Sequence, residues 1–261
     1  MRALVHPYPA GLASPALTAD LADDDLVEFY APPGEEHRHP DGMWVRFNFV
    51  ASADGAAELD GRSGGLGTPA DRRLFSLLRR PADVILVGAG TLRTEGYDGA
   101  LLSEHDRAWR RDKGMPDHPS IAVVSRQLDL DPDSAFFTNA PVRPLILTGS
   151  EADGGRKAAL AEVAEIVECG TQRAEPARIR TALAERGHRL VHAEGGPTVF
   201  GWFAADRLAD ELCLSVSPLL AGPDAGRIVA GPSLPESSSL DLVGLLEEDG
   251  ALFGRYRVRR S

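Results

Sequence analysis

The chain has 261 residues, a formal net charge of −11 at pH 7 and a hydrophobic content of 43%. A chain of this length buries about three quarters of the surface that it exposes when unfolded, which suffices for one large domain or two small ones. The acidic balance argues against nonspecific binding of nucleic acid or of an anionic membrane, so an anionic ligand needs a locally positive pocket.

The two cysteines, Cys169 and Cys213, lie far apart and form no pattern typical of a disulfide or a metal site. We therefore expect a reducing compartment and no structural metal. No apolar run approaches the ~18 residues of a membrane span, and the N-terminus lacks a basic segment followed by an apolar one. These features predict a cytoplasmic protein without a membrane span or a standard export signal.

Residues 1–42 are predicted to form an N-terminal extension and linker. The acidic stretch 18–30 is typical of a short helix capped by Thr18, and the following residues, rich in Pro, Gly and charge, are typical of an exposed connector. His37 and His39 are possible metal ligands, but two histidines without a third partner are more often solvated.

The regular fold is predicted to begin with a first strand at 44–52, where apolar and polar residues alternate, followed by a sharp turn at 53–55. Thr68 suits the cap of a helix that begins at Pro69. The continuous apolar run 83–88 predicts a strand that is buried on both faces.

The rest of the chain continues this alternation of strands and helices. The hairpin formed by its last two strands is expected at the sheet edge, and the order of elements predicts one mixed-sheet α/β domain. The predicted elements are a solvated helix within 101–114, strands at 120–125, 143–149 and 165–169, helices near 155–163 and 175–186, a strand at 190–193, a helix from Pro197, a β-rich run at 210–220, a loop at 221–236 and strands at 240–247 and 251–259.

Glycine turns adjoin several of these elements, at 64–67, 88–90 and 195–196. Glu194 ends a predicted strand, and Pro197 suits a first helical position. Ligands bind at this edge of open α/β sheets, where a helix N-terminus offers free N–H groups to an anion. Taken alone, the segment is equally compatible with an ordinary strand–helix connection.

Standard site motifs are missing from the chain. The G-x-G-x-x-G fingerprint fails because Arg93 stands where its third glycine would be, which disfavours a standard Rossmann site. The chain has no G-x-S-x-G, and nothing supports a Cys–His nucleophile pair.

A succession of segments resembles the bacterial riboflavin-biosynthesis pyrimidine reductase, the reductase part of a bifunctional deaminase–reductase. The resemblance covers about residues 43–258 in unbroken order. The deaminase signature, H-x-E followed by P-C-x-x-C, is absent, so a free-standing reductase is implied. The segments are NFVASADG (48–55), TPADRRLFSLLR (68–79), ILVGAGT (85–91), AEGGPT (193–198) and DELCLSVSPLLAG (210–222).

This resemblance implies a dihydrofolate-reductase-like fold over residues 43–261, a mixed sheet flanked by helices with antiparallel C-terminal strands. It implies NADPH as hydride donor, a small-molecule acceptor such as 5-amino-6-(5-phosphoribosylamino)uracil, and a homodimer. The run 212–220 is apolar enough to be either a central strand or an edge that pairs across a two-fold axis.

The resemblance also implies two groups of binding residues. The substrate group is Asn48, Ser52, Ser63, Arg79 and Glu194. The cofactor group is Ala51, Gly65, Gly90, Thr91, Glu95, Ser125, Arg126, Gly195, Gly196, Pro197, Thr198 and Val199.

Two carboxylates are candidates for catalysis. Hydride transfer to a sugar imine or a pteridine C=N bond leaves a nitrogen that must gain a proton. We assign the proton to Asp54 and substrate anchoring to Glu194, and we expect one of them to have a raised pKa in a water-poor pocket. The simpler alternatives are that Asp54 is a turn residue, that Arg79 solvates a helix end and that Ser125 ends a strand.

The chain departs from the family pattern at two places. Ala56 stands where the family usually has Lys or Arg, and Thr94-Glu95-Gly96-Tyr97 replaces a usual D-D-P. Both changes fall near the expected substrate or nicotinamide. They leave two alternatives open: a pteridine or dihydrofolate-like substrate, and an NADPH-binding paralogue without the original activity.

Overall fold

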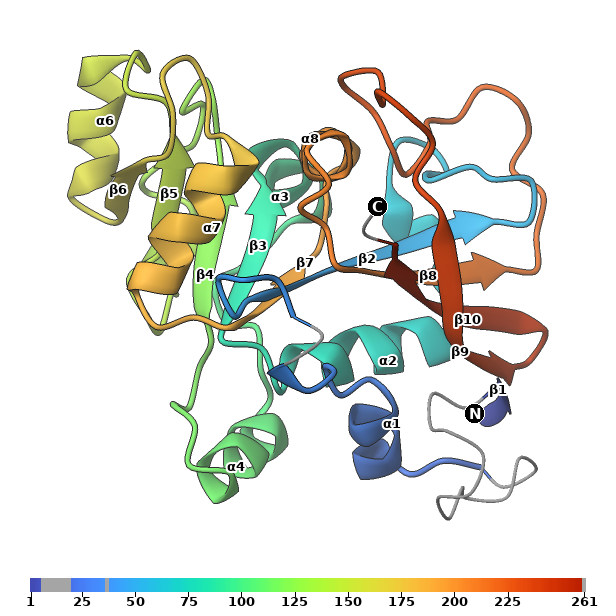
Figure 1. Cartoon of the computed structure of the whole chain (residues 1–261). Helices are drawn as coiled ribbons and strands as arrows, with labels where there is room; N and C mark the ends of the chain where they lie inside the picture. Colours follow the sequence, from blue (N-terminus) through green and yellow to red (C-terminus); the bar gives the residue numbers. More distant parts are fainter. Residues whose placement is uncertain (6–19, 36–37, 260–261) are drawn as a thin grey trace.

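The computed structural model describes residues 1–5, 20–35 and 38–259, and these form a ten-stranded sheet flanked by helices (Figure 1). The strands are β1 (Arg2–Val5), β2 (Trp44–Ser52), β3 (Val84–Gly88), β4 (Ser120–Val124), β5 (Leu145–Thr148), β6 (Glu165–Glu168), β7 (Leu190–Ala193), β8 (Glu211–Ser217), β9 (Leu240–Glu248) and β10 (Ala251–Val258). The helices are α1 (Asp23–Phe29), the 3-10 turn η2 (Ser63–Gly65), α2 (Pro69–Arg79), α3 (Ala89–Glu95), α4 (Glu104–Asp112), α5 (Ala135–Thr138), α6 (Gly154–Ala161), α7 (Pro176–Glu185) and α8 (Pro197–Ala205).

The sheet order is β1-β9-β10-β8-β2-β7-β3-β4-β5-β6. Strands from β8 to β6 run parallel to one another, whereas β10, β9 and β1 add antiparallel pairs. The predicted fold class, a mixed α/β sheet with antiparallel C-terminal strands, is confirmed.

Two details of the sequence-based prediction are wrong, and one open alternative is decided. The first strand is β1, not 44–52, and because β1 pairs with β9 the C-terminal hairpin is not the edge of the sheet. Of the two alternatives for the run 212–220, the central strand is confirmed, because β8 lies between β10 and β2 and is not an edge of the sheet. The segment 101–114 is not simply solvated, because Asp106 and Arg110 of α4 are buried.

Residues near the N-terminus belong to the same core as the sheet. Leu26 and Phe29 of α1 are buried beside Leu246 and Phe253 of the antiparallel strands. The helix begins after Ala22, and the predicted cap Thr18 lies outside the described residues, as does His37.

The described residues bear on two expectations from the sequence, that the protein has no metal site and no membrane span. His39 Nδ1 lies 3.4 Å from Asp41 Oδ1, and no cluster of three or more potential metal ligands occurs among those residues. None of the helices that they form has both the length and the apolar character that a membrane crossing requires.

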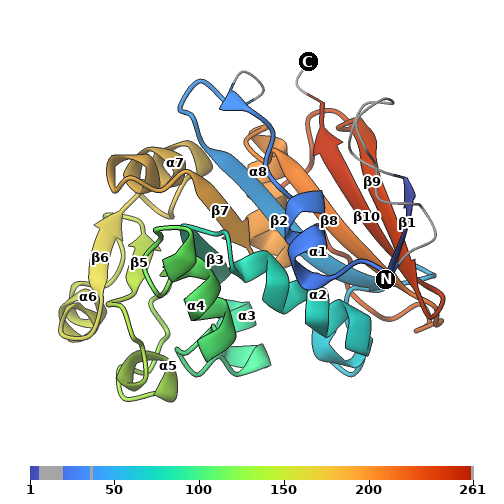
Figure 2. The same ribbon diagram turned by 90° about the horizontal axis from the view of Figure 1, so that it is seen from below.

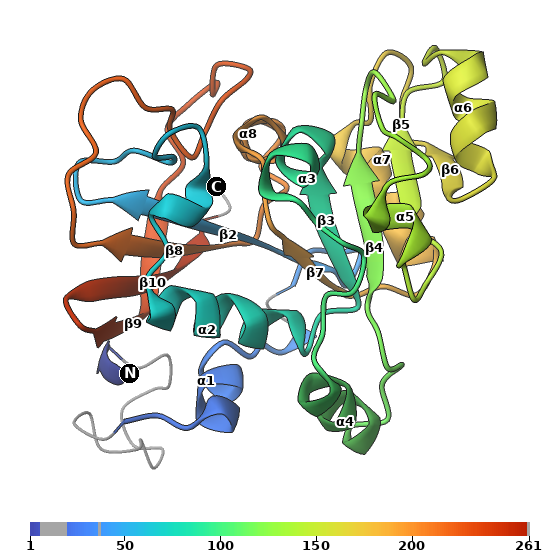
Figure 3. The same ribbon diagram turned by 180° about the vertical axis from the view of Figure 1, so that it is seen from behind.

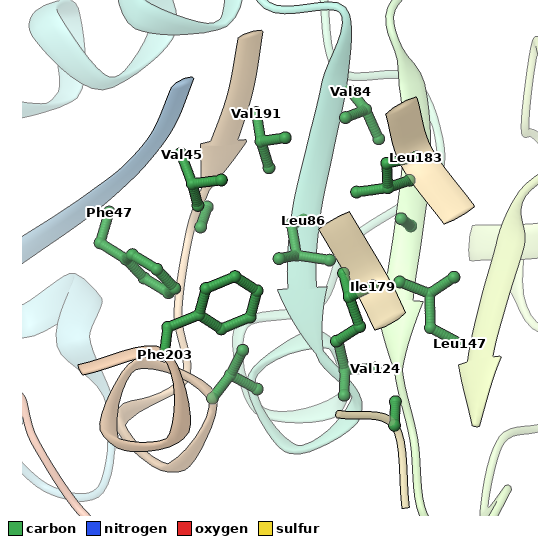
Figure 4. Packing of buried hydrophobic residues seen from close by; sticks show 14 of the residues in the cluster. Val45, Phe47, Val84, Leu86, Val124, Leu147, Ile179, Leu183, Val191 and Phe203 are labelled. Carbon is green, nitrogen blue, oxygen red and sulfur yellow. The ribbon is translucent and has the colours of Figure 1, made fainter. Parts of the chain in front are cut away.

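The parallel half of the sheet is covered on both faces. Helices α7 and α8 pack on one face, where Ile179 lies against Leu86 and Phe203 against Phe47 (Figure 4). Helices α3, α5 and α6 pack on the opposite face (Figure 3). Each fully buried Leu, Ile or Phe contributes about 1.5–3 kcal/mol, so this packing fixes the strand ends that form the site.

The antiparallel half is covered by α1 and α2 on one face (Figure 2). Helix α2 forms as predicted, because the Thr68 hydroxyl accepts the Asp71 N–H at 3.1 Å and Pro69 occupies the first helical position. Its last residue, Arg79, reaches the carboxyl ends of the parallel strands, which makes α2 a wall of the site described below.

Beneath α1 and α2 lies a buried ionic cluster around Glu211. Its carboxylate accepts hydrogen bonds from Trp44 Nε1 at 2.6 Å, Arg46 Nε at 2.9 Å and Arg255 Nε at 2.9 Å. Burial opposes ionisation, but the two guanidinium groups outweigh it and lower the pKa of Glu211 to about 2. The cluster therefore joins β2, β8 and β10 through one ionised carboxylate.

We predict that Glu211→Gln lowers the free energy of unfolding by about 3–5 kcal/mol, because it leaves two buried guanidinium groups without a counter-ion. The contribution of Glu211 is complete above its unfolded pKa and is lost as pH falls toward its folded pKa of about 2. Urea denaturation should therefore show the difference from wild type shrinking from about pH 5 to about pH 2.

The control is Glu165→Gln, which breaks a half-exposed pair with Arg186. This change should cost less than about 1 kcal/mol, because exposed ion pairs contribute little. A difference between wild type and Glu211→Gln that stays constant over the acid range would contradict the assignment.

Candidate active site

The site lies where the strand order reverses. After β3 the chain runs outward through β4, β5 and β6, and then returns to place β7 between β2 and β3. A cavity of about 830 Å³ opens at the carboxyl ends of these strands. Ligands of open α/β sheets bind at such a reversal, so both its position and its size fit a dinucleotide with a small substrate.

The glycine turn after β7 forms the centre of the cavity wall. Gly88 N–H donates to Gly195 O at 2.9 Å, which holds the turn against the end of β3. Gly195 has a φ of +96° and is joined to Gly196 by a cis peptide bond. A Cβ on Gly196 would lie only 2.6 Å from Thr91 Oγ1, so this close approach requires glycine.

Helix α8 begins directly after this turn. Gly196 is its N-cap and offers no side-chain acceptor, and Pro197 is its first residue. The N–H groups of Thr198 and Val199 therefore stand at the positive end of the helix, at the cavity wall. Gly90 lines the same cavity, and a Cβ there would meet no atom within 4 Å, so the wall leaves open space for a phosphate.

An ionic cluster also lines the cavity, directly before the glycine turn. Arg79 Nε and Nη2 donate to the two oxygens of Glu194 at 2.6 and 2.8 Å, and the Tyr97 hydroxyl donates to Glu194 Oε2 at 2.6 Å. The Arg79 guanidinium also lies 4.4 Å from the centre of the Phe75 ring. Arg79 is thus a fixed partner of Glu194 rather than a solvated helix end.

The Glu194 side chain is fully buried, whereas that of Arg79 is 13% exposed. Burial opposes the charge of Glu194, but Arg79 and Tyr97 outweigh it and hold the pKa of Glu194 below its ordinary value. Burial and the neighbouring Glu194 carboxylate raise the pKa of Tyr97 well above 10. Glu194 is therefore an ionised anchor, and Tyr97 keeps its proton.

The predicted proton donor Asp54 is placed elsewhere. Its exposed carboxylate accepts hydrogen bonds from the Ser52 hydroxyl, from Ala221 N–H at 3.1 Å and from Gly222 N–H at 2.9 Å, and it does not line the cavity. The Ser52 hydroxyl and these two N–H groups lower the pKa of Asp54 to about 2. The expected raised pKa is therefore wrong for both carboxylates, and Asp54 holds a turn and a loop together.

Most of the other predicted residues line the cavity. Ser63 N–H and Oγ both donate to Glu95 Oε1 at 2.9 Å, so a predicted substrate residue and a predicted cofactor residue bind each other. The predicted residues that line the cavity are Asn48, Ser63, Arg79, Gly90, Thr91, Glu95, Ser125, Arg126, Glu194, Gly195, Gly196, Pro197, Thr198 and Val199.

Ala51, Ser52 and Gly65 do not line the cavity. Ala51 and Ser52 are buried at the end of β2, and the Ser52 hydroxyl accepts the Ala56 N–H at 2.9 Å. A Cβ on Gly65 would lie 3.2 Å from Leu59 Cβ, within the loop itself.

Ser125 has a structural role that the sequence analysis also considered. Its buried hydroxyl accepts the Leu128 N–H at 3.0 Å and so ends β4 in a turn. Its neighbour Arg126 lines the cavity and forms no ion pair within residues 1–5, 20–35 and 38–259.

Several cavity residues were not predicted from the sequence. Tyr97 entered only as a departure from a family pattern. Its hydroxyl is the one feature of the sequence that could have indicated a hydrogen-bond partner for Glu194. Arg72, Arg173, Trp202 and Arg227 carried no local signal, because segments far apart in the chain bring them to the cavity.

Comparison with known proteins identifies the family. Residues 43–249 match the RibD C-terminal domain family. The chain is 25% identical over 215 residues to the 2,5-diamino-6-ribosylamino-4(3H)-pyrimidinone 5′-phosphate reductase of Archaeoglobus fulgidus, covering 82% of this chain and 98% of that protein. It is 28% identical over 188 residues to the reductase of the same name from Methanothermobacter thermautotrophicus, covering 72% and 80%.

Among solved structures, a pyrimidine reductase-like protein from Corynebacterium diphtheriae is similar, with a TM-score of 0.79 and 26% identity. That match covers 92% of this chain and 100% of the other. The glycine turn, the start of α8 and the Arg79–Glu194–Tyr97 cluster all lie inside the region that the family model matches. The chain belongs to the RibD C-terminal domain family of reductases.

Proposed function

We propose that this protein uses NADPH to reduce the ribosylamino group of a ribosylaminopyrimidine 5′-phosphate. The proposal rests on one observation above all: a single cavity joins the uncapped N-terminus of α8 to the ionic cluster of Glu194. The names of the two archaeal reductases support the same class of substrate.

The residues present fit a nicotinamide dinucleotide. Gly90 leaves open space in the cavity that the first turn of α8 also lines. The N–H groups of that turn and the helix dipole favour a pyrophosphate, by about 0.3–1 kcal/mol from the dipole alone. Arg126 lies in the same cavity wall, after β4, and supplies positive charge for a further phosphate. NADPH supplies a hydride when bound.

Arg79 and Tyr97, which Glu194 orients, position the substrate. The bidentate contact fixes the plane of the Arg79 guanidinium, and the Tyr97 hydroxyl is held at the same carboxylate. Ala56 is buried and outside the cavity wall, whereas Arg72 and Arg227 line it and bring positive charge to the substrate phosphate.

The reaction adds a hydride to the carbon of a ring-opened C=N bond and a proton to its nitrogen. Asp54 and Glu194 both have lowered pKa values, so neither holds a proton near neutral pH. Tyr97 directs its own proton toward Glu194. We therefore propose that the proton comes from cavity water, and that catalysis arises mainly from orientation of the substrate against the cofactor.

NADPH should stabilise the protein more than NADH does at equal concentration, because Arg126 loses a phosphate partner with NADH. At a hundredfold excess over its dissociation constant, NADPH should raise the free energy of unfolding by about 2.7 kcal/mol. Thermal denaturation measures both shifts, and the Arg126→Ala variant should bring them closer together. Equal shifts in the wild type would contradict the phosphate site.

Asp54→Asn should lower kcat by far less than the ~10²-fold that follows removal of an acid–base group. Glu194→Gln should lower kcat/KM by about tenfold or more, because an amide cannot accept the fork of Arg79 together with the Tyr97 hydroxyl. Steady-state oxidation of NADPH measures the kinetic constants of both variants. Asp54→Asn is the matched control, because it also replaces a carboxylate by an amide. A larger loss of kcat in Asp54→Asn than in Glu194→Gln would refute the assignment.

A further inference from the structure

Arg173 and Trp202 form a stacked pair on the cavity wall. Arg173 lies between β6 and α7, and its Cζ is 4.5 Å from the centre of the Trp202 ring on α8. Both residues line the same cavity as Gly196 and Arg126. Stacking on an indole fixes the plane of a guanidinium while leaving its N–H edges free to bind.

The loop that carries Arg173 is held closely against the end of β5. A Cβ on Gly149 would lie 2.3 Å from Thr171 O and 2.7 Å from Arg173 N. Gly170 has a φ of +154°, and a Cβ there would lie 2.2 Å from Arg173 O. The backbone of Arg173 is thus fixed by contacts that only glycine permits at these two positions.

Among the described residues, Arg173, like Arg126, lacks the acidic partner that Arg79 and Arg93 have. Arg79 is paired with Glu194 at 2.6 Å, and Arg93 lies 3.9 Å from Asp129. Arg173 donates to Ala174 O at 3.2 Å and forms no ion pair in the described part of the chain. An unneutralised guanidinium in a protein of net charge −11 indicates a site for an anion.

The position of Arg173 indicates which anion. Trp202 is four residues beyond Thr198, so the two share a helix face and Trp202 lies one turn past the N–H groups proposed for the pyrophosphate. Arg126 follows β4 and Arg173 follows β6, with only β5 between them. The strand ends leading to the two arginines are therefore about 10 Å apart.

We propose that Arg173 and Arg126 together bind the phosphate on the adenosine ribose of the cofactor, with Trp202 holding Arg173 in place. The inference rests on the proposed use of NADPH and adds a residue that determines cofactor specificity. Two planar guanidinium groups that approach one phosphate from different strands can both form charge-assisted hydrogen bonds. An unphosphorylated ribose offers neither group a charged partner.

The test is calorimetric titration with adenosine 2′,5′-bisphosphate and with ADP, two fragments that need no catalytic activity. Arg173→Ala should weaken binding of the bisphosphate by about tenfold or more and that of ADP by less than about twofold. Arg173→Lys keeps the charge but not the stacked plane, so it should give an intermediate loss. Trp202→Leu should lower the ratio of the two affinities.

Arg178→Ala is the matched control, because Arg178 is an exposed arginine of α7 paired with Glu175 and lies outside the cavity wall. It should leave both affinities unchanged, and circular dichroism should show every variant folded. Equal weakening of ADP and bisphosphate by Arg173→Ala would overturn the inference. The inference would also be overturned if Arg173→Ala left both affinities unchanged while Arg126→Ala abolished the preference for the bisphosphate over ADP. In that case the proposed use of NADPH would still hold. If the wild type bound neither NADPH nor the bisphosphate, the proposed function would fail as well.

Discussion

The ion pair between Arg79 and Glu194 is the contact on which the site depends. It joins the end of α2 to the end of β7, and the Tyr97 hydroxyl adds the segment after α3. Three parts of the chain thus meet at one buried carboxylate, and that carboxylate directly precedes the glycine turn. A shift of α2 would therefore move the cluster and the start of α8 together.

The alternation of the strands explains why ionic groups gather on one face of the sheet. His192 of β7 and Glu194 directly after it face α2, whereas Val191 and Ala193 face α7 and α8. His192 Nε2 lies 3.8 Å from Glu194 Oε1, and burial lowers the pKa of His192 to about 4. His192 therefore stays neutral near pH 7, and Glu194 remains free to balance Arg79.

Local chemistry made much of the fold and part of the site predictable. Gly195, Gly196 and Pro197 indicate a turn and a helix start wherever they follow a buried strand, and Thr68 with Pro69 indicates a helix start in the same way. These features depend only on neighbours in the sequence, so they could be predicted from it. The structure confirms both helix starts. Most of the binding residues that the resemblance to a family implies line one cavity.

What the sequence could not predict depends on contacts between distant segments. Strand β1 has only four residues, and its partner β9 lies more than 230 residues away, so no local pattern reveals the pair. The contacts of Asp54 were not predictable, because Ala221 and Gly222, whose N–H groups donate to its carboxylate, belong to a remote loop. Tyr97 was missed for the same reason.

We propose that a hydride passes directly from NADPH to the sugar carbon of the substrate inside this cavity. NADPH carrying deuterium at both positions of the nicotinamide C4, incubated with the protein and a ribosylaminopyrimidine 5′-phosphate, tests this step by mass spectrometry of the product. Direct transfer should give a ribitylamino product with one deuterium at C1′. Failure to oxidise NADPH with this substrate, together with deuterium transfer to dihydrofolate, would contradict it.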